Sequence, residues 1–116
     1  MHELSIAMSL VELASERARR AGAGRVTRLN LRIGALRGIE DESMRQAFEA
    51  ARIDSPCGDA ELRIENVPLR ARCRACGAEY DIEGAEWACS VCGSDGELLD
   101  GGDELQLASI EVEGEP

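Results

Sequence analysis

Apolar residues recur at helical spacing near the start of the chain. Leu4, Ala7, Met8, Val11, Ala14 and Ala18 fall on one face at steps of three and four residues. Ile6, Leu10 and Leu13 widen that face, so the pattern predicts a well-buried helix over residues 3–21. Arg17, Arg19 and Arg20 favour the negative end of the helix dipole, and Gly22 marks the stop.

A second, shorter helix is predicted over residues 41–52. Its apolar stripe consists of Met44, Ala47, Phe48 and Ala51. Glu40, Asp41 and Glu42 cluster at its start, where carboxylates favour the positive end of the helix dipole. This capping effect accounts for the three acids without any further role.

Alternation of apolar and polar residues predicts three strands, although it is strict only in the first of them. Over residues 25–33, Thr27, Leu29, Leu31 and Ile33 point one way, while Arg28, Asn30 and Arg32 point the other way into water. Residues 61–72 form a second predicted strand, with a slip near Pro68 that indicates a bulge or an edge position. A last strand is expected over residues 104–112.

Two CxxC pairs stand between the second and third of these strands. Cys73 and Cys76 are separated by twelve residues from Cys89 and Cys92, and a glycine follows each pair. Four thiolates that converge tetrahedrally suit Zn²⁺ and leave no open coordination position, which is typical of a structural site. A rubredoxin-like iron site uses the same ligands. A redox disulfide motif instead has one CxxC near a βαβ pattern.

These elements predict an α+β fold with two helices on one face of a three-stranded sheet. The cysteine segment, residues 71–103, is expected to be a small domain inserted before the last strand. Residues 1–70 and 104–116 then form the main domain. The insert is too small to fold on its apolar content alone, so metal binding must stabilise it. Tyr80 and Trp87 are the expected apolar packing around the metal.

The charge of the chain is strongly negative and unevenly spread. Seven Arg and three acids give +4 over residues 1–38, whereas six Arg and twenty acids give −14 over residues 39–116, for a total of −10. An acidic surface disfavours nucleic-acid binding. There is no basic n-region and no apolar run of membrane-spanning length. Together with the unpaired thiol of Cys57, these features predict a cytoplasmic protein.

The only histidine of the chain is His2. The α-amino group of Met1, the amide nitrogen of His2 and its imidazole can close two fused chelate rings on one metal ion. Glu3 offers a further donor. Nitrogen-rich planar or tetragonal sets suit Ni²⁺ or Cu²⁺. A surface histidine without a role is the alternative interpretation.

The opening Met1-His2-Glu3-Leu4-Ser5 resembles the start of the HypA/HybF family of nickel metallochaperones for [NiFe]-hydrogenase maturation. Leu31-Arg32-Ile33-Gly34, Ala47-Phe48-Glu49 and the two CxxC pairs also match this family, and the resemblance covers essentially the whole chain. It implies a nickel domain with two helices and three strands, and a zinc domain inserted before the last strand.

The resemblance also implies a function. By this resemblance, Ni²⁺ is expected to be transient cargo held by Met1 and His2 with Glu3 close by. It is expected to pass, with a HypB-type GTPase, to the hydrogenase large-subunit precursor, or to urease as in some members. Cys73, Cys76, Cys89 and Cys92 match the structural zinc ligands. Glu40 stands where some members have an Asp linked to nickel. A monomer and a homodimer both remain open.

Two other classes of function compete with metal delivery. A zinc-ribbon nucleic-acid or transcription module is favoured by the Cys₄ insert and by Arg70, Arg72 and Arg74 around the first cysteine pair. The net charge and the few aromatic residues oppose it. A metal-dependent enzyme lacks its catalytic groups, because the chain has one histidine, no lysine and a closed metal site. The chain is therefore expected not to be an enzyme.

Overall fold

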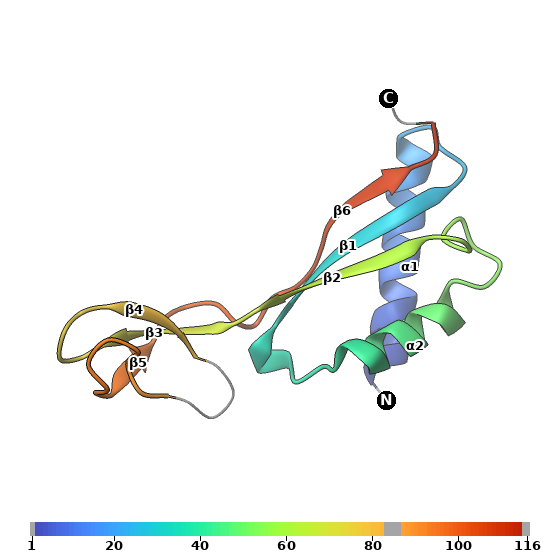
Figure 1. Cartoon of the computed structure of the whole chain (residues 1–116). Coiled ribbons are helices and arrows are strands. Elements are labelled where there is room, and N and C mark those ends of the chain that lie inside the picture. Colours follow the sequence, from blue (N-terminus) through green and yellow to red (C-terminus); the bar gives the residue numbers. More distant parts are fainter. Residues whose placement is uncertain (1, 83–86, 115–116) are drawn as a thin grey trace. The chain divides into compact units, whose positions relative to one another are not determined.

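The structure is a computed structural model of the whole chain, and it describes residues 2–82 and 87–114, apart from the side chain of His2 (Figure 1). The chain forms two compact units. The helix unit comprises Met1–Arg32, Ile39–Glu65 and Gln106–Pro116. The cysteine unit comprises Ile33–Gly38 and Asn66–Leu105. None of the described helices has the length and apolar character needed to cross a membrane.

Helix α1 spans His2–Arg20, as the apolar periodicity predicts. Its buried face consists of Ala7, Leu10, Val11, Ala14 and Ala18. The prediction that the whole widened apolar face is well buried is wrong, because Leu4, Met8 and Leu13 are exposed. Near its C-terminal end, the Arg17 guanidinium donates a hydrogen bond of 2.9 Å to the carbonyl of Leu107. This bond fastens the helix to the last strand.

The sheet of the helix unit has the strand order β2-β1-β6 among the described residues. These strands span Glu61–Val67, Val26–Gly34 and Leu105–Val112. Side-chain hydrogen bonds on the outer face of the sheet show the strand directions. Arg28 donates to Glu61 and Arg32 donates to Glu65, so β2 runs parallel to β1. Arg28 also meets Glu111, and Asn30 meets Ser109, so β6 runs antiparallel to β1.

Helix α2 spans Asp41–Ala51 and is the crossover that parallel β1 and β2 require. It packs against α1 (Figure 1), and its buried residues are Met44 and Phe48. Leu29 and Leu31 of β1 are fully buried, whereas Arg28 and Arg32 on the opposite face are partly exposed. The apolar face of the sheet therefore meets the helices, and this confirms the predicted α+β architecture.

The cysteine unit contains a second small sheet with the strand order β4-β3-β5. Its strands span Glu79–Ile82, Leu69–Cys73 and Gly96–Leu98, and both neighbours pair antiparallel with β3. The prediction of one strand over residues 61–72 is wrong at Pro68. The chain ends β2 there and begins β3, which belongs to a different sheet. Proline has no N–H to continue the first ladder.

Residues Ile33–Gly38 join the cysteine unit although they follow β1 directly. They contain a short 3₁₀ helix, η1, over Ala35–Arg37. The amide of Gly34 donates to the carbonyl of Glu104, and the amide of Leu36 donates to the carbonyl of Gly102, both at 2.7 Å. The segment is therefore held by the loop that precedes β6.

Candidate functional site

The first cysteine pair forms a tight turn at the end of β3. The amide of Gly77 donates to the carbonyl of Cys73 at 3.0 Å, and the amides of Ala75 and Cys76 point at the Cys73 sulfur, each at 3.4 Å. Gly77 has φ 77°, a left-handed conformation that glycine adopts without steric cost. The turn thus aims both cysteine side chains to one side.

The second pair repeats this geometry. The amide of Gly93, which has φ 78°, donates to the carbonyl of Cys89 at 2.8 Å. The amide of Val91 lies 3.3 Å from the Cys89 sulfur. Sequence reasoning identified the cysteines and glycines but missed these amide groups. The position of each glycine directly after its CxxC pair was the signal for them, because such a turn directs successive amides towards the first sulfur.

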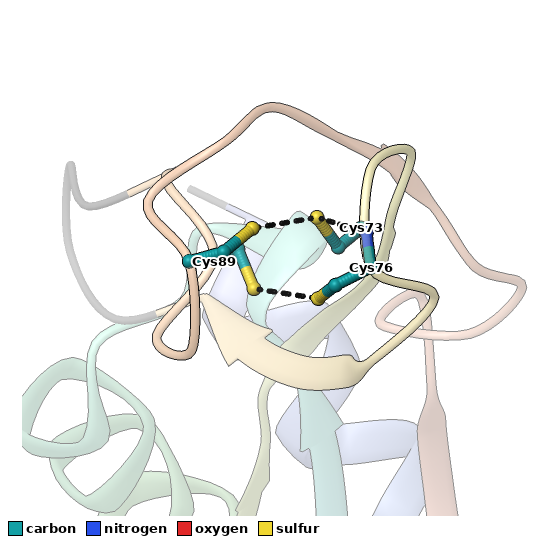
Figure 2. Close-up of side chains that lie close together, drawn as sticks. Cys73, Cys76 and Cys89 are labelled. Atoms are coloured by element: carbon teal, nitrogen blue, oxygen red, sulfur yellow. Dashed lines mark hydrogen bonds between the residues drawn. The ribbon is translucent and has the colours of Figure 1, made fainter.

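The two turns face each other and bring the four sulfurs together (Figure 2). All four Sγ atoms lie within 4.8 Å of one another. The Sγ atoms of Cys73 and Cys92 are 3.4 Å apart, and those of Cys76 and Cys89 are 3.7 Å apart. A tetrahedron with Zn–S bonds of about 2.3 Å has edges of about 3.8 Å, whereas a disulfide needs about 2.05 Å. All five cysteines are free. The quartet therefore fits a tetrahedral cation such as Zn²⁺.

The thiols of the quartet differ in pKa. Hydrogen bonds from the side chain and amide of Ser94 lower the pKa of the Cys92 thiol to about 6. The Ala78 amide acts to lower the pKa of Cys76, but hydrogen bonding with Cys73, desolvation and the other sulfurs outweigh it and raise that pKa to about 11. A cation that binds all four sulfurs must therefore displace protons, which couples metal binding to pH.

A small apolar cluster supports the first turn. It consists of Ala71, Cys73, Tyr80, Ile82 and Cys89. The Tyr80 hydroxyl donates to the carbonyl of Trp87 at 2.8 Å, which satisfies its polar end. The expected packing of Tyr80 is confirmed, but that of Trp87 is wrong, because its side chain is 49% exposed. That the insert depends on a bound metal ion for folding stays a prediction.

The arginines around the first turn do not form a free basic patch. Arg70 pairs with Asp81 and Glu79, Arg72 pairs with Glu79, and Arg74 lies 3.8 Å from Glu97. Every one of these three guanidinium groups thus faces a carboxylate. Phosphate binding would have to displace those partners. The structure gives no support to the nucleic-acid alternative.

The expected nickel ligands lie at the opposite end of the sequence. Met1 and the side chain of His2 lie outside the described residues. The backbone of His2 begins α1, and Glu3 lines a surface depression with residues of α2. Glu40 is the exposed N-cap residue of α2, and its side chain makes no capping hydrogen bond. Its position at the start of α2, with Asp41 and Glu42 in the first turn, agrees with the predicted interaction of these acids with the positive end of the helix dipole.

Cys57 lies apart from the quartet. It is fully buried in the helix unit, with its sulfur 4.0 Å from the Ser15 hydroxyl. Burial raises the pKa of its thiol, although hydrogen bonds with Ser15 and Ser55 act in the opposite direction. A buried thiol with a raised pKa is a poor nucleophile. This agrees with its interpretation as a small core residue.

Three comparisons place this chain among known proteins. A family model described as "Hydrogenase/urease nickel incorporation, metallochaperone, hypA" matches residues 1–112. The hydrogenase maturation factor HypA of Wolinella succinogenes is 40% identical over 116 residues, which cover 99% of this chain and 98% of the relative. That of Chlorobaculum tepidum is 42% identical over 113 residues, which cover 97% and 100%.

Solved structures agree with the sequence relatives. The solution structure of the Ni metallochaperone HypA from Helicobacter pylori has a TM-score of 0.63 and 27% identity, covering 95% of this chain and 96% of its own. A second solution structure, titled HypA protein, has a TM-score of 0.68 and 29% identity, covering 99% and 98%. The likeness in fold and in sequence therefore extends over nearly the whole length of both proteins.

Proposed function

The chain belongs to the HypA family of nickel-incorporation metallochaperones that act in hydrogenase maturation. We propose that it binds Ni²⁺ at its N-terminus and delivers the ion to the large-subunit precursor of a [NiFe]-hydrogenase. One observation carries this proposal. The only histidine of the 116 residues stands at position 2, beside the α-amino group.

The chemistry of the N-terminus fits Ni²⁺ as cargo. The α-amino nitrogen of Met1, the amide nitrogen of His2 and its imidazole form two fused chelate rings, and nitrogen-rich tetragonal sets suit Ni²⁺. Glu3 supplies a nearby carboxylate. Glu40, whose side chain does not cap α2, is a candidate for an additional contact with the metal.

Zn²⁺ is the resident metal in this proposal, held by Cys73, Cys76, Cys89 and Cys92. The spacing of the four sulfurs and the amide groups directed at them support it. A closed Cys₄ site supplies folding free energy and no catalytic position. The role of the zinc is therefore to fold residues 71–103, and the chain acts as a carrier and not as an enzyme.

Delivery requires partners. A HypB-type GTPase and the hydrogenase large-subunit precursor are the proposed ones, in the cytoplasm, with urease as a second possible client. A site made from the first residues of a chain exchanges metal more readily than an enclosed one, which suits cargo. Both a monomer and a homodimer are compatible with this scheme.

Titration with Ni²⁺ tests the proposed site. Isothermal calorimetry on the zinc-loaded protein compares the unmodified chain with the His2→Ala variant. We expect the variant to lose at least about tenfold in Ni²⁺ affinity, which corresponds to about 1.4 kcal/mol. Circular dichroism and zinc content serve as controls for folding. Equal Ni²⁺ affinities in two folded proteins would refute the site.

A further inference from the structure

A surface depression separates the first turn of α1 from one side of α2. We call it the α1–α2 groove, and it is lined by Glu3, Leu4, Ser43, Gln46, Ala47 and Ala50. The four residues from α2 recur at steps of three and four, so they form one continuous stripe of that helix. Three of them have small side chains, which leaves room beside Leu4.

Apolar surface is exposed along the α1 side of this groove. Leu4 is 45% exposed, and Met8, one turn further on the same face, is 57% exposed. Both lie outside the buried face formed by Ala7, Val11 and their neighbours. Covering these two half-exposed side chains removes apolar surface from water, which favours a complex. The groove is thus an apolar surface that gains from a partner.

Carboxylates border the groove on both helices. Glu3 lines it directly. On α2, Glu42 and Glu49 lie four residues before and three residues after Gln46, so both are surface neighbours of a residue that lines the groove.

The arginine within α2 and the one at its C-cap bind backbone carbonyls. Arg45 donates to the carbonyl of Leu62, and Arg52 donates to that of Ala60 and stacks over Phe48. Among the residues that the structure describes, no Arg side chain lines the groove. The charge complementary to this surface is therefore positive.

The outer face of the sheet offers no comparable surface. Arg28 on that face is held between Glu61 and Glu111, and Arg32 pairs with Glu65. Leu13 is also exposed, but it lies on the opposite flank of α1 from Leu4, since nine helical steps turn a side chain by about half a circle. It therefore does not extend the groove.

We propose that the α1–α2 groove docks an amphipathic helix of a partner protein, whose apolar residues cover Leu4 and Met8 and whose flanking Lys or Arg residues meet the surrounding carboxylates. An amphipathic helix laid into an apolar groove is a recurrent mode of recognition. One part of this inference rests on the proposed function. Because Glu3 lines the groove, a docked helix would lie beside the proposed N-terminal nickel ligands.

Two synthetic helical peptides test the proposal. They share one apolar stripe of Leu at steps of three and four residues, and they differ in flanking residues, which are Lys in one and Glu in the other. Binding to the full, zinc-loaded chain is measured by fluorescence anisotropy at moderate ionic strength. The protein variants are Leu4→Ser/Met8→Ser and, as a matched control on the same helix, Leu13→Ser.

We expect the Lys peptide to bind and the Glu peptide not to bind. The double variant should weaken binding of the Lys peptide by at least about tenfold, whereas Leu13→Ser changes it by less than about twofold. Amide shifts in the NMR spectrum should locate the peptide at residues 4, 8, 47 and 50. Circular dichroism establishes that each variant is folded.

Other outcomes would overturn the proposal. Equal binding of both peptides, or equal loss in both variants, would mean non-specific association. A dimer that the double variant dissociates, seen by sedimentation with no peptide bound, would mean that a second copy occupies the groove. Ni²⁺ titration of the double variant distinguishes failure of the groove proposal from failure of the nickel-site proposal. Normal Ni²⁺ affinity together with lost peptide binding shows that the substitutions affect the groove and not the metal site.

Discussion

A Cβ atom on Gly34 would lie 2.1 Å from the carbonyl oxygen of Gly102. The two segments approach so closely because the amide of Gly34 donates to the carbonyl of Glu104 while the amide of Leu36 donates to that of Gly102. The atoms that such a side chain would strike belong to the backbone, so they cannot rotate away. This contact secures residues 33–38 within the cysteine unit.

Replacement of this glycine should therefore destabilise the cysteine unit. We expect Gly34→Ala to lower its free energy of unfolding by at least about 2 kcal/mol, as overpacking does in tightly packed sites. The fluorescence of Trp87, the only tryptophan, follows this unit during urea unfolding. Gly24→Ala is the matched control, because nothing lies within 4 Å of its added Cβ. Equal effects of the two substitutions would contradict the close approach.

Loss of one cysteine of the quartet should unfold the cysteine unit and leave the helix unit folded. In Cys73→Ala, we expect zinc content to fall below about one ion per chain and Trp87 to lose its cooperative transition, because metal binding supplies the folding free energy. The circular dichroism of α1 and α2 should largely persist. Elemental analysis of the unmodified chain also distinguishes Zn²⁺ from a rubredoxin-like iron.

Cys57→Ala provides the control for this experiment. It removes a fully buried sulfur outside the quartet, so zinc content should stay unchanged while stability falls by about 1 kcal/mol. Loss of zinc from this variant would mean that the two units do not fold independently.

The buried thiol of Cys57 should also make stability depend on alkaline pH. Burial raises its pKa above the usual 9.0. The folded state therefore binds this proton more tightly than the unfolded state, and its contribution is present below pH 9 and is lost as the pH rises through the folded pKa. We expect the urea concentration at the midpoint of unfolding to decrease as the pH rises above 9. The Cys57→Ala variant should lack the part of this decrease that comes from the Cys57 thiol. An identical alkaline decline in both proteins would exclude Cys57 as its source.

The periodicity of apolar residues predicted the helices and the central strand well. Leu29 and Leu31 alternate with Arg28 and Arg32, and the structure buries the former pair and leaves the latter partly exposed. The same periodicity overestimated the burial of α1, because it does not say how wide a face the neighbouring elements cover. Leu4 and Met8 repeat at helical spacing, yet no described element covers them fully.

Long-range features were less accessible from the sequence. The alternation slips at Pro68, but a slip alone does not distinguish a bulge from a strand that changes sheet. The grouping of residues 33–38 with the cysteine unit depends on hydrogen bonds to Gly102 and Glu104, almost seventy residues away. The convergence of the four cysteines was predictable, because CxxC turns followed by glycine have a fixed local geometry.

The measurement that tests the proposed nickel site most directly is Ni²⁺ binding by a chain extended at its N-terminus by two residues, Gly and Ser. The extension converts the α-amino group of Met1 into an amide and leaves His2, Glu3 and the cysteine quartet in place. Calorimetry should show a loss of at least about tenfold in Ni²⁺ affinity, with zinc content and circular dichroism unchanged. Undiminished Ni²⁺ affinity in the folded, extended chain would contradict the assignment of the metal to the N-terminal amine and His2.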